Sequence, residues 1–543
     1  MNLLKNNLLK NKTAFYAVLL LAMLVQTFPF GFRYFPFADD YFALGTFSLL
    51  RSNSWLNIWQ DIVVNFQLFG FRPLAGILEA YFFSAFWPNM AIPLLLITVL
   101  RLLTLYLFGE IMEKSGIIWG RGAVVFFAFF PTMTESAYWL SASVRIVTSG
   151  FLGVLAAYSM LRFLCDEGKY GRNKPWLPIA FVSGLAAQGF YEQGIIFTFL
   201  VTMGVLVLHH KRVPFFALFL WPVANLFVIG VHYFIFRDVG WLGPRAEVEL
   251  NFIRHFPIIL ERMARTFFLE QVHTIVNTLR WGLAFLFTEH PALIIVVAAL
   301  SALLAIFVVY NRKTYLETRT YVLTVIAAFV LIMGPMSLFF VLPGSWIWVR
   351  NFYFSMIGLA VLVGIFAQFG HAVKGLVVFV AVFLFFSGYI MEVESIRRAG
   401  YYDSLIVGRL VDKLENTEVA GDEVWLFGMR WNYAPKINPR IASQLWIDWA
   451  ADIHYGYVHA SRHGFSQHYR FIPVMDGQRV YMGFADSLML GLDGDLQVRL
   501  LHFDGGDLIF SDSGEVFGSV DSEGVLILIP SPAHYIRDEG IFY

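Results

Sequence analysis

The chain has 543 residues, of which 58% are hydrophobic and only 14% charged, and its formal net charge is zero. Soluble globular proteins are about 45–50% apolar and about 25% charged. This composition excludes a disordered chain, a nucleic-acid-binding protein and an ordinary soluble enzyme, and it predicts a polytopic membrane protein. The single cysteine, Cys165, excludes a disulfide framework and a cysteine-only metal site.

Charged residues are concentrated towards the C-terminus. Residues 393–543 hold 33 of the 78 charged residues, 21 of them acidic and 12 basic. We therefore predict two domains, an α-helical transmembrane domain over 1–392 and a water-soluble domain over 393–543. The second domain is long enough to form a hydrophobic core of its own.

Apolar runs follow one another from the N-terminus to residue 391. The first, at about 13–32, comes after Lys5, Lys10 and Lys12, which place the N-terminus in the cytoplasm by the positive-inside rule. Further runs lie at about 73–90, 91–112, 116–131, 143–164, 175–190, 193–209, 214–236, 291–310, 320–340, 352–369 and 375–391.

The run at 73–90 differs from the others because Glu79 and the pair Trp87-Pro88 interrupt it. We expect it to form an interfacial or re-entrant helix, since all later lysine-rich turns then lie in the cytoplasm. The fold class predicted is an α-helical polytopic membrane protein with about eleven transmembrane helices. Its C-terminal domain is extracytoplasmic, of α+β class and rich in β-strands.

Two adjacent carboxylates, Asp39 and Asp40, follow the first span in the segment FADDYF. Ionisable groups near membrane depth are costly and tend to mark a function. Neighbouring acids raise each other's pKa, which suits one of them to act as a general base near neutral pH. The alternative is that one of them caps an amphipathic helix over 41–50.

Other polar residues lie at the predicted outer ends of spans. They are Arg72 in FRPL, Glu135 and Trp139 in FPTMTESAYW, Tyr191 and Glu192 in FYEQG, and Arg350 and Tyr353 in WIWVRNFYF. Arg350 has no neighbouring acid, and the bidentate fork of arginine suits phosphate recognition. Arg245 is one of six arginines in a long loop at about 237–290, where six acids balance them and snorkelling to the interface is the alternative role.

The order of these motifs resembles the GT-C superfamily of membrane glycosyltransferases over about residues 13–370. An acidic pair follows the first helix, and Arg72-Pro73-Leu74 opens a later one. Pro131-Thr132-Met133-Thr134-Glu135 with Trp139 looks like the P-x-x-T-E…W segment of O-mannosyltransferases that carry tetratricopeptide repeats. The aminoarabinose transferases are a similar type.

The segment Phe190-Tyr191-Glu192-Gln193-Gly194 is similar to the S-K-E-Q-G segment of those O-mannosyltransferases only in its E-Q-G part. Phe190 and Tyr191 stand where serine and lysine are usual. The donor-phosphate contact of that lysine is therefore not carried over to position 191.

The resemblance implies an inverting transfer of a sugar from a polyprenyl-phosphate carrier to an extracytoplasmic acceptor. It implies that Asp40 or Asp39 is the general base and that Arg350, with Arg72 or Arg245, neutralises the leaving phosphate. Contacts to sugar or acceptor are expected from Glu135, Glu192, Trp139 and Tyr353. No cofactor or divalent metal is required, and the partners are the lipid-linked donor, a glycan or protein acceptor and the bilayer. We expect a bacterial inner membrane location.

The C-terminal domain reads as a helix at about 401–414 followed by short strands. The strands are expected at about 423–428, 479–483, 496–501, 507–510 and 525–529. Its histidines, His454, His459, His463 and His468, include a pair one helical turn apart that resembles a zinc site. No cysteine and no suitably placed acid completes a set of zinc ligands. We therefore expect this histidine segment to contact an acceptor glycan, or the domain to form a structural cap over the membrane cavity.

Other function classes remain open on the sequence alone. A transporter or flippase of a lipid-linked sugar predicts polar groups near the midplane and internal repeats; no repeat is evident in this sequence. An O-antigen ligase or polymerase would rely on arginines more than on an acidic pair. A non-catalytic scaffold would leave the acidic pair, Glu135 and Glu192 without a role.

Overall fold

A computed structural model gives the structure of the chain. It describes residues 11–36, 40–45, 47–48, 72–116, 120–165, 175–209, 223–224, 227, 252–310, 318–340, 349–366, 374–417, 423–429, 470–475, 479–481, 487–493, 495–522 and 525–528. The chain divides into two compact units. Unit 1 comprises Met1–Phe32, Gln60–Leu78 and Ala91–Val393, and unit 2 comprises Arg33–Trp59, Glu79–Met90 and Glu394–Tyr543.

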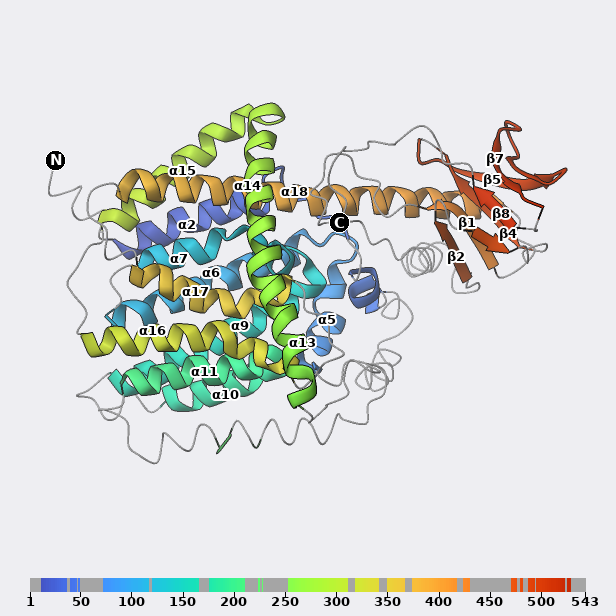
Figure 1. Ribbon diagram of the computed structural model, residues 1–543. Helices are drawn as coiled ribbons and strands as arrows, with labels where there is room; N and C mark the ends of the chain where they lie inside the picture. Colours follow the sequence, from blue (N-terminus) through green and yellow to red (C-terminus); the bar gives the residue numbers. More distant parts are fainter. Residues whose placement is uncertain are drawn as a thin grey trace. The chain divides into compact units, whose positions relative to one another are not determined.

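Unit 1 is a bundle of helices. Its helices are α2 (Lys12–Thr27), α6 (Ala91–Lys114), α7 (Gly120–Phe129), α8 (Thr134–Ala137), α9 (Leu140–Cys165), α10 (Trp176–Gln188), α11 (Glu192–Leu208), α13 (Phe252–Ala264), α14 (Gln271–Thr288), α15 (Pro291–Tyr310), α16 (Thr318–Met333) and α17 (Tyr353–Phe366), joined by the short turns η3 (Pro131–Met133), η6 (Arg265–Glu270), η7 (Gly334–Phe340) and η8 (Val349–Phe352). Most of the long helices run side by side, whereas α13 and α14 cross them steeply (Figure 1).

Five helices among the described residues are long and apolar enough to cross a membrane. They are Ala91–Lys114, Leu140–Cys165, Pro291–Tyr310, Tyr321–Phe340 and Gly375–Glu415. The chain is therefore an integral membrane protein. Ten of the eleven runs predicted to span coincide with helices, and the run at 214–236 lies almost wholly outside the described residues. The count of eleven spans stays a prediction.

Local sequence signals explain where several helices begin. The Asn11 side chain caps α2 by accepting hydrogen bonds from the backbone N–H groups of Thr13 and Ala14, at 2.9 and 3.4 Å. Pro291 opens α15, a position at which its missing N–H costs nothing. Glu192 begins α11, where a negative charge interacts favourably with the helix dipole.

The expected loop at 237–290 is corrected by the structure, because residues 252–288 are helical through α13, η6 and α14. Within α13, Ile259 and Met263 are buried whereas Glu261 and Arg262 are exposed. Apolar residues four apart mark one face of a helix. Glu261 and Arg262, two of the polar residues that suggested a loop, therefore lie on an exposed face of a helix.

Helices α14 and α18 (Lys374–Glu415) approach each other closely within unit 1. A Cβ atom added at Gly282 would lie 2.6 Å from the backbone nitrogen of Gly388 and 2.7 Å from the carbonyl oxygen of Ser387. One turn further on, the Thr278 hydroxyl donates to Glu392 Oε1 at 2.6 Å, and both side chains are fully buried. Glycine at position 282 is therefore required by the contact between backbones.

Helix α18 runs without a break for 42 residues. The sequence predicted two separate helices here, at 375–391 and at 401–414. The apolar stretch ends before the charged residues Glu392, Glu394, Arg397 and Arg398, and from Glu394 onwards the helix belongs to unit 2.

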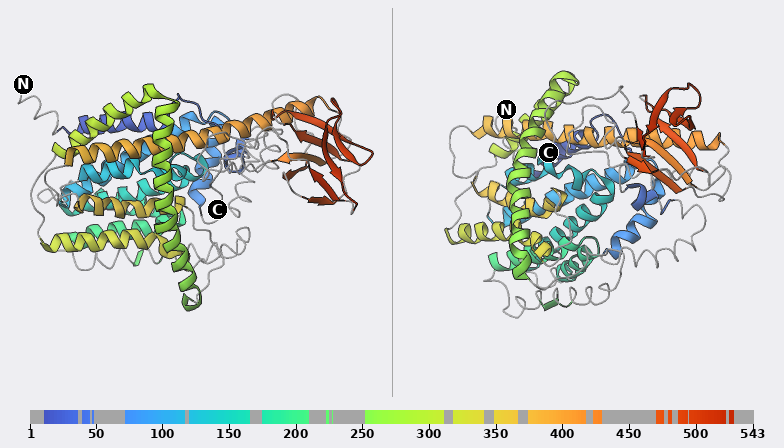
Figure 2. Two further views of the ribbon diagram at one scale, coloured as in Figure 1. Left: turned by 45° about the horizontal axis from the view of Figure 1, so that its top comes forward. Right: turned by 45° about the vertical axis from the view of Figure 1, so that its right-hand side comes forward.

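Unit 2 also contains an eight-stranded sheet (Figure 2). The strands are β1 (Glu423–Met429), β2 (Arg470–Met475), β3 (Arg479–Tyr481), β4 (Leu488–Leu492), β5 (Val498–Asp504), β6 (Asp507–Phe510), β7 (Val516–Val520) and β8 (Val525–Leu528). Their order is β2-β1-β4-β5-β6-β7-β8-β3. Strand β1 pairs in parallel with β2 and β4, and the remaining pairs are antiparallel.

Alternating residues of β1 contribute to two separate hydrophobic cores. Val424 and Leu426 pack with Ile406, Leu410 and other apolar residues of α18 and β4. Phe427 belongs to the second core, which includes Leu508, Phe510 and Leu526 and against which Trp425 packs. Period-two alternation thus places one face of β1 against the helix and the other against the antiparallel strands.

Candidate active site

An arginine–glutamate ion pair joins the residue preceding α5 (Pro73–Tyr81) to the start of α11. Arg72 donates from Nε and Nη2 to the two carboxylate oxygens of Glu192, at 2.7 and 2.9 Å. The backbone N–H groups of Leu74 and Ala75 donate to the carbonyl of Gly189, which brings the two segments together. A Cβ atom at Gly189 would lie 2.7 Å from the Leu74 side chain, so this approach requires glycine.

The aromatic ring of Tyr191 supports this pair. The Arg72 guanidinium carbon lies 4.5 Å from the ring centroid, a distance at which the cation is attracted by the ring. The buried amide of Asn351, in η8, donates to the Tyr191 hydroxyl at 3.0 Å. The ring of Phe354, in α17, stacks on that of Tyr191 at 6.0 Å between centroids. Position 191 is thus an aromatic platform that links α11, η8 and α17.

Arg350 has a different environment in η8, next to Asn351. Its guanidinium carbon lies 4.7 Å from the ring centroid of Trp139, which is only 8% exposed and immediately precedes α9. Among the described residues, no hydrogen-bond acceptor or carboxylate engages the Arg350 guanidinium, which is half-buried. The stack therefore holds the side chain by its face, and its N–H edge has no partner in the part of the chain that the structure describes.

Arg145, in the second turn of α9, completes a group of three arginines. Arg72, Arg145 and Arg350 all lie within electrostatic range of the Tyr191 hydroxyl, as does Glu192. These four groups together carry a net positive charge. An excess of arginine over acid at a half-buried site favours an anionic ligand that contains oxygen.

Sequence reasoning missed Arg145 and Asn351. Arg145 meets the same criterion that singled out Arg350, because it lies near one end of a span and the stretch LSASVRIVTSG contains no acid. Asn351 carries no chemical signal in the sequence, and its contact with Tyr191 emerges only when η8 and α11 are packed together.

Two other predicted contact residues of unit 1 are described. Glu135 is half-buried in the first turn of α8. Tyr353, the first residue of α17, is fully buried. Its ring centroid lies 5.5 Å from that of Phe127, and the ring packs against Gly150 of α9. Their roles in binding sugar or acceptor stay predictions.

Asp40 belongs to unit 2 and is fully buried there. The Tyr34 hydroxyl donates to Asp40 Oδ2 at 2.5 Å. The next residue, Tyr41, has its hydroxyl 3.1 Å from Ser404 Oγ on α18. Other predicted site residues lie outside the described part of the chain: Asp39, Arg245, His454, His459, His463 and His468.

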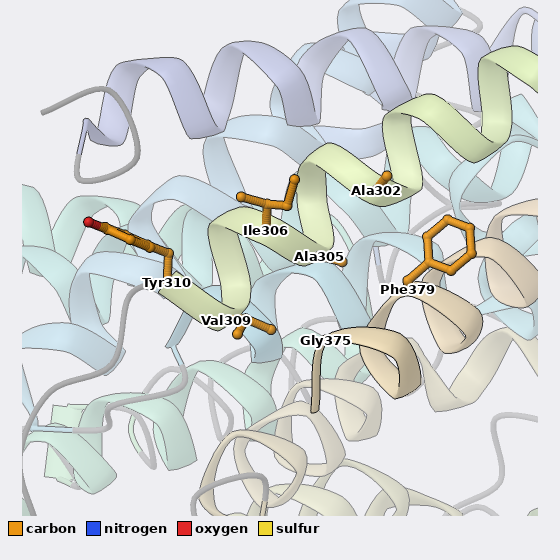
Figure 3. A pocket seen from close by; sticks show the side chains of 7 residues that line it. All are labelled: Ala302, Ala305, Ile306, Val309, Tyr310, Gly375 and Phe379. Carbon is orange, nitrogen blue, oxygen red and sulfur yellow. The ribbon is translucent and has the colours of Figure 1, made fainter. Parts of the chain in front are cut away.

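A cavity of about 630 Å³ lies between α15 and α18, and the described residues that line it include none of the predicted site residues. Figure 3 shows Ala302, Ala305, Ile306, Val309 and Tyr310 on one side and Gly375 and Phe379 on the other. The described lining is apolar except for the Tyr310 hydroxyl. Within the described ranges, no three histidine, cysteine, aspartate or glutamate side chains gather as a metal site would need.

No protein-family model and no curated protein sequence matches the chain. Among solved structures, the chain is similar to the crystal structure of ArnT from Cupriavidus metallidurans bound to undecaprenyl phosphate. The TM-score is 0.33 and the identity 12%, over 88% of this chain and 92% of that one. ArnT is a GT-C aminoarabinose transferase, the class that the motif order resembles. At this TM-score the likeness carries no inference about activity.

Proposed function

We propose that the protein is an inverting glycosyltransferase that moves a sugar from a polyprenyl-phosphate carrier to an extracytoplasmic glycan or protein acceptor. One observation carries the proposal: the Arg350 guanidinium is held by its face on Trp139 with its N–H edge unpaired among the described residues. A guanidinium fixed in this way is pre-organised to donate two parallel hydrogen bonds to a phosphate.

The three arginines have different proposed roles in binding the phosphate. Arg72 already gives its Nε and Nη2 hydrogens to Glu192, so it contributes mainly through its charge. Arg350 is the proposed direct ligand, with Arg145 adding positive charge within electrostatic range of Tyr191. Donors fixed before the reaction stabilise the charge that develops on the leaving phosphate without further reorganisation. The proposed step therefore needs no divalent metal.

The proposed reaction is a single displacement. The acceptor hydroxyl attacks the anomeric carbon while the bond from that carbon to the phosphate oxygen breaks, and the electron pair leaves with the polyprenyl phosphate. Asp40, or its neighbour Asp39, takes the hydroxyl proton as general base. The buried Tyr34 hydroxyl holds the Asp40 carboxyl in one orientation. Glu192 orients Arg72, and Glu135, Trp139 and Tyr353 contribute sugar or acceptor contacts; Arg245 is a further candidate for the phosphate.

Transfer of radiolabel from a panel of polyprenyl-phosphate sugars into membrane glycan or protein tests the proposal. We expect wild type to transfer label from one donor and Arg350→Gln to lose about 10-fold or more, since a hydrogen bond to a charged group contributes about 1.5–3 kcal/mol. Arg162→Gln is the matched control, because Arg162 also stacks on a tryptophan, Trp176, near the other end of α9.

The outcomes separate the parts of the proposal. Absence of transfer by wild type from every donor would overturn it and favour a transporter, which a flipping assay would then detect. Equal losses of transfer activity in Arg350→Gln and Arg162→Gln would contradict the assignment of Arg350 as the phosphate ligand. Full activity in both Asp39→Asn and Asp40→Asn would show that another residue is the general base, and the proposal of a glycosyltransferase would stand.

A further inference from the structure

A buried arginine in the middle of α6 has no place in the mechanism above. Arg101 is only 1% exposed and lies within one of the helices long enough to cross a membrane. No carboxylate of the described residues forms an ion pair with it, and its Nε has no hydrogen-bond partner among them. Ionisable side chains buried within a membrane-spanning segment are costly, and those that persist tend to serve a function.

The charge of Arg101 is compensated at the C-terminal end of α7. Its Nη2 donates to the carbonyl of Ala128, the second-last residue of α7, at 2.5 Å. The side-chain amide of Gln26, in α2, donates to the same carbonyl at 3.2 Å. The helix ends here because Pro131 has no N–H to continue it. The last carbonyls of a helix lack intrahelical donors and carry partial negative charge, so Arg101 caps α7 with a cation.

The same guanidinium joins this end of α7 to α18. Its Nη1 donates to the Tyr389 hydroxyl at 2.8 Å, and its central carbon lies 5.0 Å from the centroid of the Tyr389 ring. One turn earlier on α18, the ring of Phe386 packs against that of Phe129, the last residue of α7, with 4.9 Å between centroids. Helices α2, α6, α7 and α18 are therefore joined around Arg101.

The last turn of α7 leads to both partners of the cation–π stack at the candidate site. The ring of Phe127, in that turn, lies 5.5 Å from that of Tyr353 between centroids. Tyr353 directly follows η8, which carries Arg350. Along the chain, α7 continues through η3 and α8 to Trp139, and both η3 and α8 contact η8. Arg350 and Trp139 therefore both depend on the turn that Arg101 caps.

We propose that Arg101 is a positioning residue for the candidate phosphate site: by capping α7 it fixes Tyr353 and Trp139, and through them the direction in which Arg350 presents its N–H groups. The planar fork is required because it reaches two acceptors at once, a carbonyl of α7 and a hydroxyl of α18. Lysine keeps the charge without this fork. Binding of the donor phosphate by Arg350 rests on the proposed function, whereas the capping of α7 does not.

Hydrogen exchange of the full-length protein in nanodiscs tests the capping of α7 without measuring transfer. The backbone N–H groups of Tyr138, Ala142 and Ser143 donate to carbonyls of Thr134 and Trp139, in the segment that follows α7. In Arg101→Lys we expect these three amides to exchange about 10-fold faster or more, because losing a hydrogen bond to a charged group lowers the free energy of local opening. The amides of α10 should be unchanged.

Arg121→Lys is the matched control. Arg121 is also a buried arginine beside an aromatic ring, that of Phe15, but it lies at the opposite end of α7. Its replacement should leave the three amides unchanged. Tyr389→Phe, which keeps the ring and removes the hydroxyl acceptor, replaces Arg101→Lys if that variant does not fold, and should change the exchange in the same direction.

Titration with polyprenyl phosphate measures the positioning of Arg350. Arg101→Lys should weaken binding by about 5-fold or more, since a misdirected guanidinium loses part of its charge-assisted hydrogen bonding. In the background of Arg350→Gln the same change should alter Kd by no more than about 2-fold, because no guanidinium is left to position. Arg121→Lys should leave Kd unchanged.

The outcomes separate positioning from a general structural role. Equal weakening of binding by Arg101→Lys with and without Arg350 would overturn the proposal, as would unchanged exchange of the three amides. Equal effects of Arg101→Lys and Arg121→Lys would do the same. If wild type binds no polyprenyl phosphate but the exchange changes as expected, the proposed function fails and the capping of α7 by Arg101 stands.

Discussion

The stack of Arg350 on Trp139 gives the sharpest quantitative prediction. The guanidinium lies 4.7 Å from the centroid of a ring that is 8% exposed. A cation–π contact contributes about 0.5–1 kcal/mol at the surface and about 2 kcal/mol when desolvated. Since the ring is buried and the arginine half-buried, we expect Trp139→Leu to weaken binding of polyprenyl phosphate by about 1–2 kcal/mol, or about 5- to 30-fold in Kd.

Trp139 is expected to affect phosphate binding only by orienting Arg350, so the loss of affinity in Trp139→Leu should depend on Arg350. In the background of Arg350→Gln there is no cation to orient, so Trp139→Leu should then change Kd by no more than about 2-fold. Calorimetric titration of the four proteins of this double-mutant cycle with polyprenyl phosphate in nanodiscs measures both values. Trp176→Leu, which removes the ring beneath Arg162 near the other end of α9, should leave Kd unchanged. Equal effects of Trp139→Leu with and without Arg350 would refute the reasoning.

Three further predictions concern stability, measured by denaturant or thermal unfolding of the full-length protein in detergent. Gly282→Ala should destabilise by about 1–3 kcal/mol because its Cβ meets the backbone of α18, whereas Gly408→Ala, with open space around it, should stabilise by about 0.5–1 kcal/mol; equal effects would contradict the packing. Tyr191→Phe should cost about 1–3 kcal/mol by removing the acceptor of the buried Asn351 amide, and an unchanged stability would show that this hydrogen bond contributes nothing. Burial raises the pKa of the Asp403 carboxyl, on α18, so its favourable contribution is complete below about pH 4 and is lost as the pH rises through the folded-state pKa; Asp403→Asn should therefore stabilise the protein at pH 7 but not at pH 4, and a gain independent of pH would contradict that sign.

The sequence predicted the features that local patterns encode. Apolar runs located the helices, and the positions of Arg72, Glu192, Trp139 and Arg350 at the ends of those runs marked residues that the structure brings into contact in pairs. The pairing itself was not predictable. Arg72 and Glu192 are 120 residues apart, and nothing in either segment says that the carboxylate would occupy the arginine fork.

Strands β2, β4 and β7 of unit 2 were not predicted from the sequence, and the cause is physical. β2 contains Pro473, and both β4 and β7 contain a glycine, at 491 and 518. Proline and glycine lower the intrinsic preference for a strand, so tertiary pairing decides these segments.

The unbroken course of α18 restricts how this chain can be cut. At about 1.5 Å per residue, 42 residues extend about 63 Å, roughly twice the hydrocarbon thickness of a bilayer. Truncation at residue 400 would remove Ile406 and Leu410 from the sheet that they cover, so the soluble part should be excised with its helix attached.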